Sequence, residues 1–414
     1  MGDSRYDEAP LSAIADFRNG KGLFADLYAS TGKYPVFGAN GQIARTNELL
    51  NEDPVVVIGR VGAYCGSVHA AFEPSWVTDN AIVARPKPGA DVRYLYYRLK
   101  SLDLRATATG SAQPLVTQGG LAGLRAHHAP LTEQRAIAHI LGTLDDKIEL
   151  NRRMNDTLEA MARALFKSWF VDFDPVRAKA EGRQPSGMDA ETAKLFPSEF
   201  VESELGEIPK GWSVIPLYDA ATYVNGAAYA AFQPNADRRG LPIVKIAELK
   251  AGLTAQTKFS DVAMPEKYRL ATGDVLFSWS GNPDTSIDTF VWTHGAAWLN
   301  QHIFRVAPRS DEERSWILST LKYLRPVFAE IARDKQTTGL GHVTAGDMKR
   351  LLVVQPEPAI MRAWGTIAGP LLARAFQCDT ESQQLSSVRD ELLPRLLSGE
   401  LSACHDPRVA EAVA

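Results

Sequence analysis

The chain has 414 residues, a formal net charge of −4, 45% hydrophobic and 23% charged residues. This composition excludes a disordered chain, and the length predicts two to four domains. No apolar run reaches the roughly 18–20 residues needed to cross a bilayer, and the N-terminus lacks a signal-peptide core. With only three scattered cysteines (Cys65, Cys378 and Cys404), we expect a cytoplasmic protein without a disulfide framework.

Periodicity and composition divide the chain at residues 130, 204 and 355. Lys+Arg against Asp+Glu is 13 to 12 in 1–130, 10 to 14 in 131–204, 17 to 15 in 205–355 and 5 to 8 in 356–414. The acidic balance, which as a chain average argues against nucleic acid as a partner, therefore lies in the second and fourth segments. The first and third segments are neutral to slightly basic.

This alternation coincides with an internal repeat. Residues 10–20, PLSAIADFRNG, match PLYDAATYVNG at 216–226, an offset of 206. The offset drifts to 221 near Ile82 and Ile303, and it is 227 from Thr117 and Thr344 onwards. The sequence therefore predicts a duplicated domain pair, although two α+β stretches of similar length could align by accident.

Each repeat begins with short apolar runs separated by Gly, Pro, Asn and Asp. In the first repeat, 55–58 and 81–84 have the composition of buried strands, and a helix is expected near 92–102. In the second repeat, strands are expected at 274–277 and 303–306, followed by a helix around 316–333. The fold class predicted is therefore α+β.

Each repeat ends in a long helical pattern with the 4-3-4-3 spacing of a coiled-coil seam. The first seam comprises Ile137, Leu141, Leu144, Ile148, Asn151, Asn155, Leu158, Ala162, Leu165 and Trp169. Its counterpart, 227 residues later, comprises Trp364, Ala368, Leu371, Ala375, Cys378, Ser382, Leu385, Arg389, Leu392 and Leu396. We expect the two helices to pack as an antiparallel pair, the alternative being that each stripe packs on its own domain.

Four residues, two asparagines and two prolines, qualify this expectation. Asn151 and Asn155 either fix the register of the helix pair or face solvent at a wide part of the crossing. Pro370 should kink the second helix, and Pro394 should mark its fraying end before Ser398 and Gly399.

Motifs for catalysis are missing. The sequence contains no GxxxxGK[ST] phosphate loop, HExxH zinc helix or GxSxG elbow, and its cysteines and histidines form no ligand-spaced cluster. Asn282-Pro283-Asp284 lacks the second proline and the aromatic residue of adenine methyltransferases, so we interpret it as a turn. The chain is therefore predicted to be non-catalytic by itself, with no metal site and no cofactor.

Several stretches resemble the specificity subunit of type I restriction-modification enzymes. PLTEQRAIA at 130–138 is similar to the entry into that family's central conserved helix, and LEAMARALFKSWFVDF at 158–173 to its exit. LFPSEF at 195–200 and GEIPKGW at 206–212 resemble the lead-in to a second recognition domain. LLPRLLSGEL at 392–401 resembles the close of the distal conserved helix.

The resemblance implies two target recognition domains, at 1–130 and 205–355, related by a pseudo-twofold repeat. A central conserved helix with its connector (131–204) and a distal helix with its tail (356–414) would form the spacer. Each recognition domain would read one half of an asymmetric bipartite site in double-stranded DNA. The helices would set the gap and dock two modification subunits, and restriction subunits would complete the complex. S-adenosylmethionine, ATP and Mg would then belong to the partner subunits, which carry out adenine methylation and DNA cleavage.

Candidate DNA-contacting residues are side chains able to hydrogen-bond base edges, placed on loops rich in glycine or flanked by proline. In the first repeat they are Asn19, Lys21, Arg60, Tyr64, Gln113 and Gln118. In the second repeat they are Asn225, Arg238, Arg239, Lys245, Trp279, Ser280, Asn282, Lys335, Gln336, Thr337 and His342. For each of them, an exposed solvated side chain is the alternative interpretation.

Two further sets of residues have predicted roles, one in turn formation or base contact and one in docking partner subunits. Asn19 and Asn225 share one repeat position before a glycine, where forming a turn is at least as good an explanation as base contact. The candidates for docking partners are Arg152, Arg153, Arg163 and Lys167, whose alternative is a plain charged helix flank. A duplicated-domain scaffold that does not act on DNA remains the alternative function.

Overall fold

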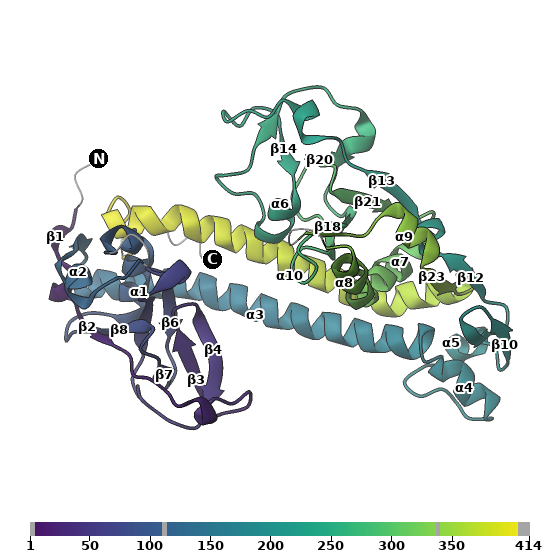
Figure 1. Cartoon of the computed structure of the whole chain (residues 1–414), viewed down its shortest axis with the longest axis horizontal. Helices are drawn as coiled ribbons and strands as arrows, with labels where there is room; N and C mark the ends of the chain where they lie inside the picture. Colours follow the sequence, from purple (N-terminus) through teal and green to yellow (C-terminus); the bar gives the residue numbers. More distant parts are fainter. Residues whose placement is uncertain (1–4, 110–113, 337–339, 405–414) are drawn as a thin grey trace. The chain divides into compact units, whose positions relative to one another are not determined.

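The computed structural model describes residues 5–109, 114–336 and 340–404. It is a mixed helix and strand structure, as predicted, with two compact units (Figure 1). The first unit comprises residues 1–149 and 384–414, and the second comprises residues 150–383. Two long helices, α3 (Leu131–Phe170) and α10 (Pro358–Ser398), each contribute residues to both units.

The first unit is built on a four-stranded antiparallel sheet in the order β2-β8-β5-β6. A smaller sheet, β4-β3-β7, joins β3 and β7 in parallel, and β1 pairs with β9. The strands are β1 (Asp7–Pro10), β2 (Ala15–Asn19), β3 (Tyr34–Gly38), β4 (Gly41–Thr46), β5 (Val55–Gly59), β6 (Val68–Ala71), β7 (Trp76–Val77), β8 (Ala81–Pro86) and β9 (Arg125–His128). The helices are α1 (Val92–Lys100) and α2 (Gln118–Gly123).

Strand β5 shows why this sheet forms. Its β-branched run Val55–Ile58 is fully buried, so alternate residues face two different cores. Val56 and Ile58 pack on the side of α1 and α3, whereas Val55 and Val57 pack on the side of the smaller sheet. The sheet is therefore covered on both faces, which a continuous apolar run requires.

The second unit repeats this topology, with the four-stranded order β13-β21-β17-β19 and the mixed sheet β15-β14-β20-β16. Its strands are β10 (Phe200–Ser203), β11 (Gly206–Pro209), β12 (Ser213–Pro216), β13 (Thr222–Asn225), β14 (Leu241–Val244), β15 (Phe259–Ser260), β16 (Arg269–Leu270), β17 (Val275–Ser278), β18 (Ser280–Gly281), β19 (Asp288–Val291), β20 (Ala297–Leu299), β21 (Ile303–Ala307), β22 (Gly341–His342) and β23 (Leu352–Gln355). Its shorter helices are α4 (Asp174–Ala180), α5 (Ala190–Leu195), α6 (Ile246–Ala251), α7 (Asp311–Tyr323), α8 (Arg325–Asp334) and α9 (Ala345–Arg350). The single helix expected around 316–333 is thus two, because α7 ends at Tyr323 and a new helix begins at Arg325, with Pro326 in its first turn.

Equivalent hydrogen bonds support the repeat. The backbone N–H of Leu11 donates to Leu124 O, and that of Leu217 donates to Leu351 O, both at 2.8 Å. Thr117 and Thr344 each cap the helix that follows them, α2 and α9, through their side-chain oxygen.

One part of the predicted alignment is off by a residue. Ile82 pairs with Asn19 and Ile58, and the residue that pairs with Asn225 and Phe277 is Phe304, not Ile303. Ile82 therefore corresponds to Phe304, an offset of 222. Ile303 faces the core beside the smaller sheet, on the other side of the strand.

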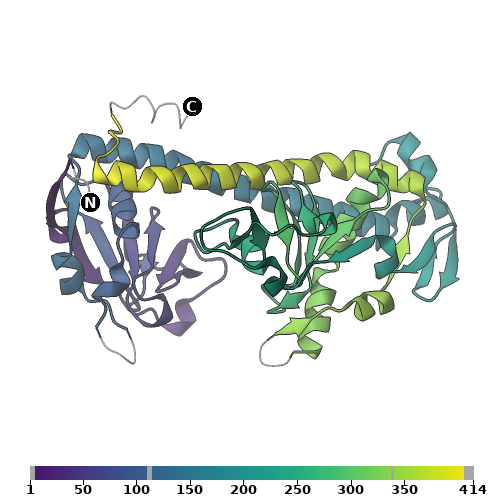
Figure 2. The ribbon, with the colours of Figure 1, turned by 90° about the horizontal axis from the view of Figure 1, so that it is seen from above.

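Helices α3 and α10 pack along each other, consistent with a coiled coil, and lie side by side in both views (Figures 1 and 2). In the second unit, residues with higher numbers on α3 contact residues with lower numbers on α10, so the two helices are antiparallel. Asn151 Nδ2 donates to Glu381 at 2.9 Å, and Asn155 Nδ2 donates to Asp379 at 2.7 Å. Asn151 is buried, so the predicted polar groups lie in the seam rather than in solvent.

Helix α10 continues without a break through Pro370 and Pro394, and it ends at Ser398, before Gly399. Pro370 is exposed.

Candidate nucleic-acid interface

Loops at one end of the first four-stranded sheet bring several predicted residues together. β2 ends at Asn19 and β5 ends just before Arg60, while β8 begins just after Asn80. The Arg60 N–H donates to Asn80 O, and the Arg60 carbonyl accepts from the Val116 N–H, both at 3.0 Å. We call Asn19, Arg60, Asn80 and Leu115 the first strand-end edge.

The second four-stranded sheet ends in the same way. β13 ends at Asn225, Trp279 follows β17, and His302 precedes β21. The Trp279 N–H donates to His302 O at 3.3 Å, and its carbonyl accepts from the Val343 N–H at 2.8 Å. We call Asn225, Trp279, His302 and His342 the second strand-end edge.

The two edges share one backbone frame. The paired hydrogen bonds of Arg60 and Trp279 make these residues structural counterparts, and they make Asn80 the counterpart of His302. The bridge between Val61 and Leu115 likewise corresponds to the β18–β22 pairing of Ser280 with His342. The frame is conserved between the units, whereas the side chains it carries differ.

Side chains on the first edge are accessible and suited to hydrogen bonding. Asn19 and Lys21 are exposed, and Tyr64 is 51% exposed. One guanidinium nitrogen of Arg60 donates to Asp79 O at 3.1 Å, which holds the side chain and leaves its other donors for a partner. Gln118 is half-buried as the first residue of α2.

Side chains on the second edge contact one another. Trp279 Nε1 donates to Asn225 Oδ1 at 3.1 Å, and Ser280 Oγ lies 2.9 Å from His342 Nδ1. Burial, with a smaller contribution from His342, lowers the pKa of His302, which favours its neutral form near pH 7.

His302 is the member of this edge that the sequence analysis missed. Its only signal was its place just before a predicted strand, and the one-residue error in alignment hid the correspondence with Asn80.

Lys245 lies close to the second edge. It follows β14, whose last residue, Val244, accepts a backbone hydrogen bond from Asn300 at 3.2 Å. Its ammonium lies 5.4 Å from the centroid of the Tyr229 ring and 4.0 Å from the Glu248 carboxylate.

Arg238 and Arg239 precede β14, at the end of the strand away from Lys245, so the structure does not bring them to the edge. The Arg238 guanidinium lies 4.5 Å from the Phe259 ring centroid, and Arg239 forms an ion pair with Asp261 at 3.1 Å.

Two further predicted residues have structural roles. Lys335 forms an ion pair with the buried carboxylate of Asp347. Burial raises the pKa of Asp347. The hydrogen bonds from Lys335, Thr344 and Arg350 outweigh that effect and hold the pKa of this carboxylate well below its usual range. Asn282 Oδ1 accepts from the N–H groups of the next turn, at 3.0 and 3.1 Å, which agrees with the predicted turn.

The remaining predicted residues form no contact with either strand-end edge among the interactions described above. Gln336 is exposed after α8, whereas Gln113 and Thr337 lie outside the described residues. Arg152, Arg153, Arg163 and Lys167 are exposed on α3. Lys167 forms an ion pair with Asp172, which raises the pKa of the lysine.

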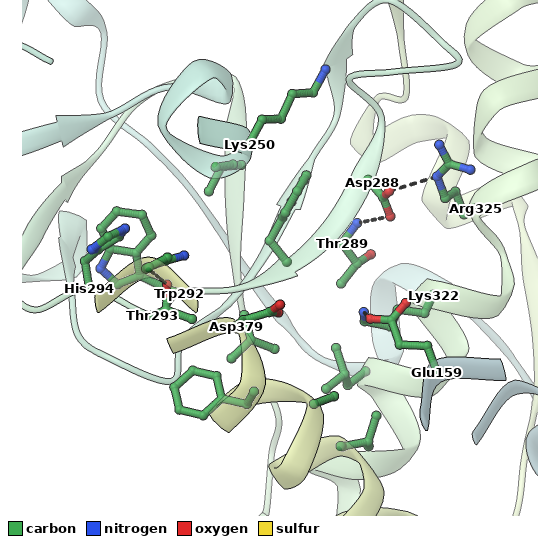
Figure 3. Close-up of a pocket in the computed structure, with 18 of the residues that line it drawn as sticks. Glu159, Lys250, Asp288, Thr289, Trp292, Thr293, His294, Lys322, Arg325 and Asp379 are labelled. Carbon is green, nitrogen blue, oxygen red and sulfur yellow. Dashed lines mark hydrogen bonds and ion pairs between the residues drawn. The ribbon is translucent and has the colours of Figure 1, made fainter. Parts of the chain in front are cut away.

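A polar cavity of about 400 Å³ lies in the second unit, apart from the strand-end edge (Figure 3). Figure 3 shows oppositely charged side chains converging on it, with Lys322 paired to Glu159 and Arg325 paired to Asp288. Asp379, from α10, also lines the cavity, and its desolvation raises its pKa to about 6, with Lys322 lowering and Glu159 raising it. These charges largely neutralise one another, so the cavity does not define a ligand of one sign.

The described residues offer neither a metal site nor a membrane-spanning helix. They contain no group of three or more histidine, cysteine, aspartate or glutamate side chains able to hold a metal ion. None of the helices in 5–109, 114–336 and 340–404 combines the length and apolar character needed to span a membrane.

Comparisons with known proteins give matches to one kind of protein. Residues 4–160 match the family model of the type I restriction modification DNA specificity domain. The chain is 27% identical over 329 residues to the type I restriction enzyme HindI specificity subunit of Haemophilus influenzae, covering 70% of this chain and 71% of that protein. It is 26% identical over 326 residues to the MjaIX specificity subunit of Methanocaldococcus jannaschii, covering 76% and 70%.

A solved structure has the same fold. The crystal structure of the type I restriction-modification system S subunit from M. genitalium superposes with a TM-score of 0.58 at 18% identity, covering 96% of this chain and 97% of that one. The family model, over residues 4–160, and the two curated relatives all make this chain similar to type I restriction-modification specificity subunits.

Proposed function

We propose that this chain directs a type I restriction-modification complex to a bipartite DNA site, with each strand-end edge contacting one half-site. Members of the family are non-catalytic by themselves, and the proposal assigns methylation, ATP-driven cleavage, S-adenosylmethionine, ATP and Mg²⁺ to partner subunits. The supporting observation is the shared backbone frame of Arg60 and Trp279, which carries different side chains in the two units. A frame of this kind can present two chemistries to two different sequences.

In this proposal α3 and α10 set the distance between the half-sites. Half-sites one turn of DNA apart are separated by roughly 34–36 Å, and helices of 40 and 41 residues are long enough to span that distance at about 1.5 Å per residue. The exposed cations of α3, Arg152, Arg153, Arg163 and Lys167, remain candidates for docking two modification subunits.

The charge of the chain adds a requirement. With a net charge of −4, few surplus cations are available to displace counterions from phosphate, so the chain alone should bind DNA weakly. Tight binding should then require the modification subunits, which would contact the duplex themselves. A double-stranded DNA partner and a protein partner are therefore proposed together.

The test is to sequence methylated adenines in cells that express this chain with its modification subunit. We expect one new asymmetric bipartite motif, absent from cells that express either protein alone. If both proteins are soluble and associated and no such motif appears, the proposal is wrong and a scaffold that does not act on DNA becomes the better explanation.

A variant with one heptad inserted at matched positions of α3 and α10 tests the spacer role. Seven residues add about 10 Å, so the gap should lengthen by about three base pairs while both half-sites stay the same. An unchanged gap in an active variant would contradict the spacer role. Seven residues inserted into the connector between α5 and β10 provide the control, which should leave the gap as it was.

A further inference from the structure

Trp279 determines how Asn225 is presented on the second strand-end edge. The indole nitrogen of Trp279 lies 3.1 Å from the side-chain oxygen of Asn225. An indole N–H can only donate, so its partner on the asparagine must be the oxygen and not the nitrogen. The Asn225 side chain is exposed, and this bond therefore fixes which way its amide group is turned.

The indole is itself held in place. Its ring lies 5.5 Å from the His302 ring and 5.9 Å from the rings of Phe304 and His342, measured between centroids. Its backbone N–H and carbonyl are both hydrogen-bonded, as described above. Trp279 is thus a rigid donor, and the amide that it orients loses little further conformational freedom on binding a ligand.

The first edge uses its equivalent position differently. Asn19 occupies the place of Asn225, but the counterpart of Trp279 is Arg60, whose guanidinium donates to Asp79 O. The two asparagines therefore share a backbone position and differ in what orients them. A role confined to turn formation would not account for the additional indole contact in the second unit.

On the basis of the proposed function, we propose that Asn225 determines specificity in the second half-site and that Trp279 is its positioning residue. An asparagine amide pairs with N6 and N7 of adenine in the major groove. The Asn225 oxygen retains one lone pair beside the Trp279 bond, and its NH₂ group is available to donate, so both halves of that contact can form. The base pair recognised is therefore an A·T pair of the second half-site.

Two variants test this inference in the complete complex with the modification subunit. Trp279→Phe removes the indole N–H and keeps an aromatic ring, and Asn225→Ala removes the amide from an exposed site. We expect both to make the same A·T position of the second half-site degenerate. Discrimination at that position should fall roughly fivefold to 150-fold, the loss of one bidentate base contact. Asn19→Ala is the matched control and should leave the second half-site unchanged.

The outcomes separate the inference from the function on which it rests. A wild-type chain that directs no bipartite methylation overturns both. A wild-type motif that Trp279→Phe and Asn225→Ala leave unchanged, or weaken equally at every position, overturns the inference alone, because a merely structural role would lower methylation without changing base preference. If Trp279→Phe fails to fold, Asn225→Ala decides the question by itself.

Discussion

The two strand-end edges differ in their side chains far more than in their backbone. Arg60 and Trp279 make the same pair of main-chain hydrogen bonds, yet one presents a cation and the other an aromatic donor. The fold therefore stabilises a loop frame while leaving its outward positions free to vary. A duplicated chain can then acquire a two-part specificity without altering its core.

A glycine in each unit offers the most severe way to break this frame. A Cβ on Gly20 would overlap the carbonyl oxygen of Thr78, and one on Gly226 would overlap that of Asn300, in equivalent places. The overlapping atoms belong to the backbone and cannot move aside. Gly20→Ala and Gly226→Ala should therefore each lower the free energy of unfolding by about 3 kcal/mol or more. Hydrogen exchange on the full chain should show increased exchange in the altered unit.

The methylated motif provides the second readout for these glycines. Gly20→Ala should disturb the half-site read by the first unit, and Gly226→Ala the other. The matched control is Gly22→Ala, since a Cβ there meets no atom within 4 Å. Equal loss of both half-sites from either variant, with the other unit still folded, would show that the two edges do not act separately.

The helix pair is held by different chemistry in the two units. In the first unit, Arg389 of α10 forms an ion pair with Asp145 of α3 at 2.7 Å, and the Tyr97 hydroxyl donates to the same carboxylate at 2.7 Å. The residues 227 positions away, Leu372 and Ala162, line one small cavity of the second unit together with charged side chains of α3 and α7. The second unit therefore has two apolar residues at the positions where the first unit has an ion pair.

Removing half of the ion pair should be costly. Arg389→Ala leaves the Asp145 carboxylate without its cation in a partly buried site, and it should lower the free energy of unfolding by about 2 kcal/mol. The double variant Asp145→Leu with Arg389→Ala reproduces the pair found in the second unit and should recover most of this loss. Chemical denaturation monitored by circular dichroism measures both. If the double variant is less stable than Arg389→Ala, the two points are not interchangeable.

Much of this architecture was predictable from the sequence, and the failures have physical causes. Local sequence patterns were enough to predict the strands and both long helices. Examples are the β-branched run Val55–Ile58 and the 4-3-4-3 spacing of the two seams. Ile82 and Ile303 were matched by identity, but a slip of one residue in a strand moves a side chain to the opposite face. Phe304 occupies the position equivalent to Ile82 because the core requires a large apolar side chain there and not one particular residue type.

The candidate site was predictable only in part, for a related reason. Asn225, Trp279, Ser280 and His342 were all singled out as loop residues, but nothing in their spacing shows that β17, β21 and β22 bring them together. Their contacts depend on strand pairing across more than 100 residues of sequence, from Asn225 to His342. The ion pair between Lys335 and Asp347 was likewise not predictable, because local periodicity does not indicate which carboxylate a lysine on a loop will meet.

Acidity offers the mildest test of the contrast between the units. Where the first unit joins its helices through an ion pair, the second joins Asn155 to Asp379, whose pKa desolvation raises to about 6 from an ordinary value of 3.8. A carboxyl whose pKa is raised by folding destabilises the fold when ionised. The stability it contributes is complete below about pH 4 and is lost as the pH rises through about 6.

Asp379→Asn should therefore stabilise the second unit above pH 6 by less than about 1 kcal/mol, because solvent screens the group. It should also flatten the change in melting temperature between pH 4 and 7 relative to the parent chain. Asp390→Asn, on the same helix in the first unit, is the control. A parent chain that becomes more stable from pH 4 to 7, with Asp379→Asn following the same curve, would show that the carboxylate is well solvated and that the two helix contacts differ less than their chemistry indicates.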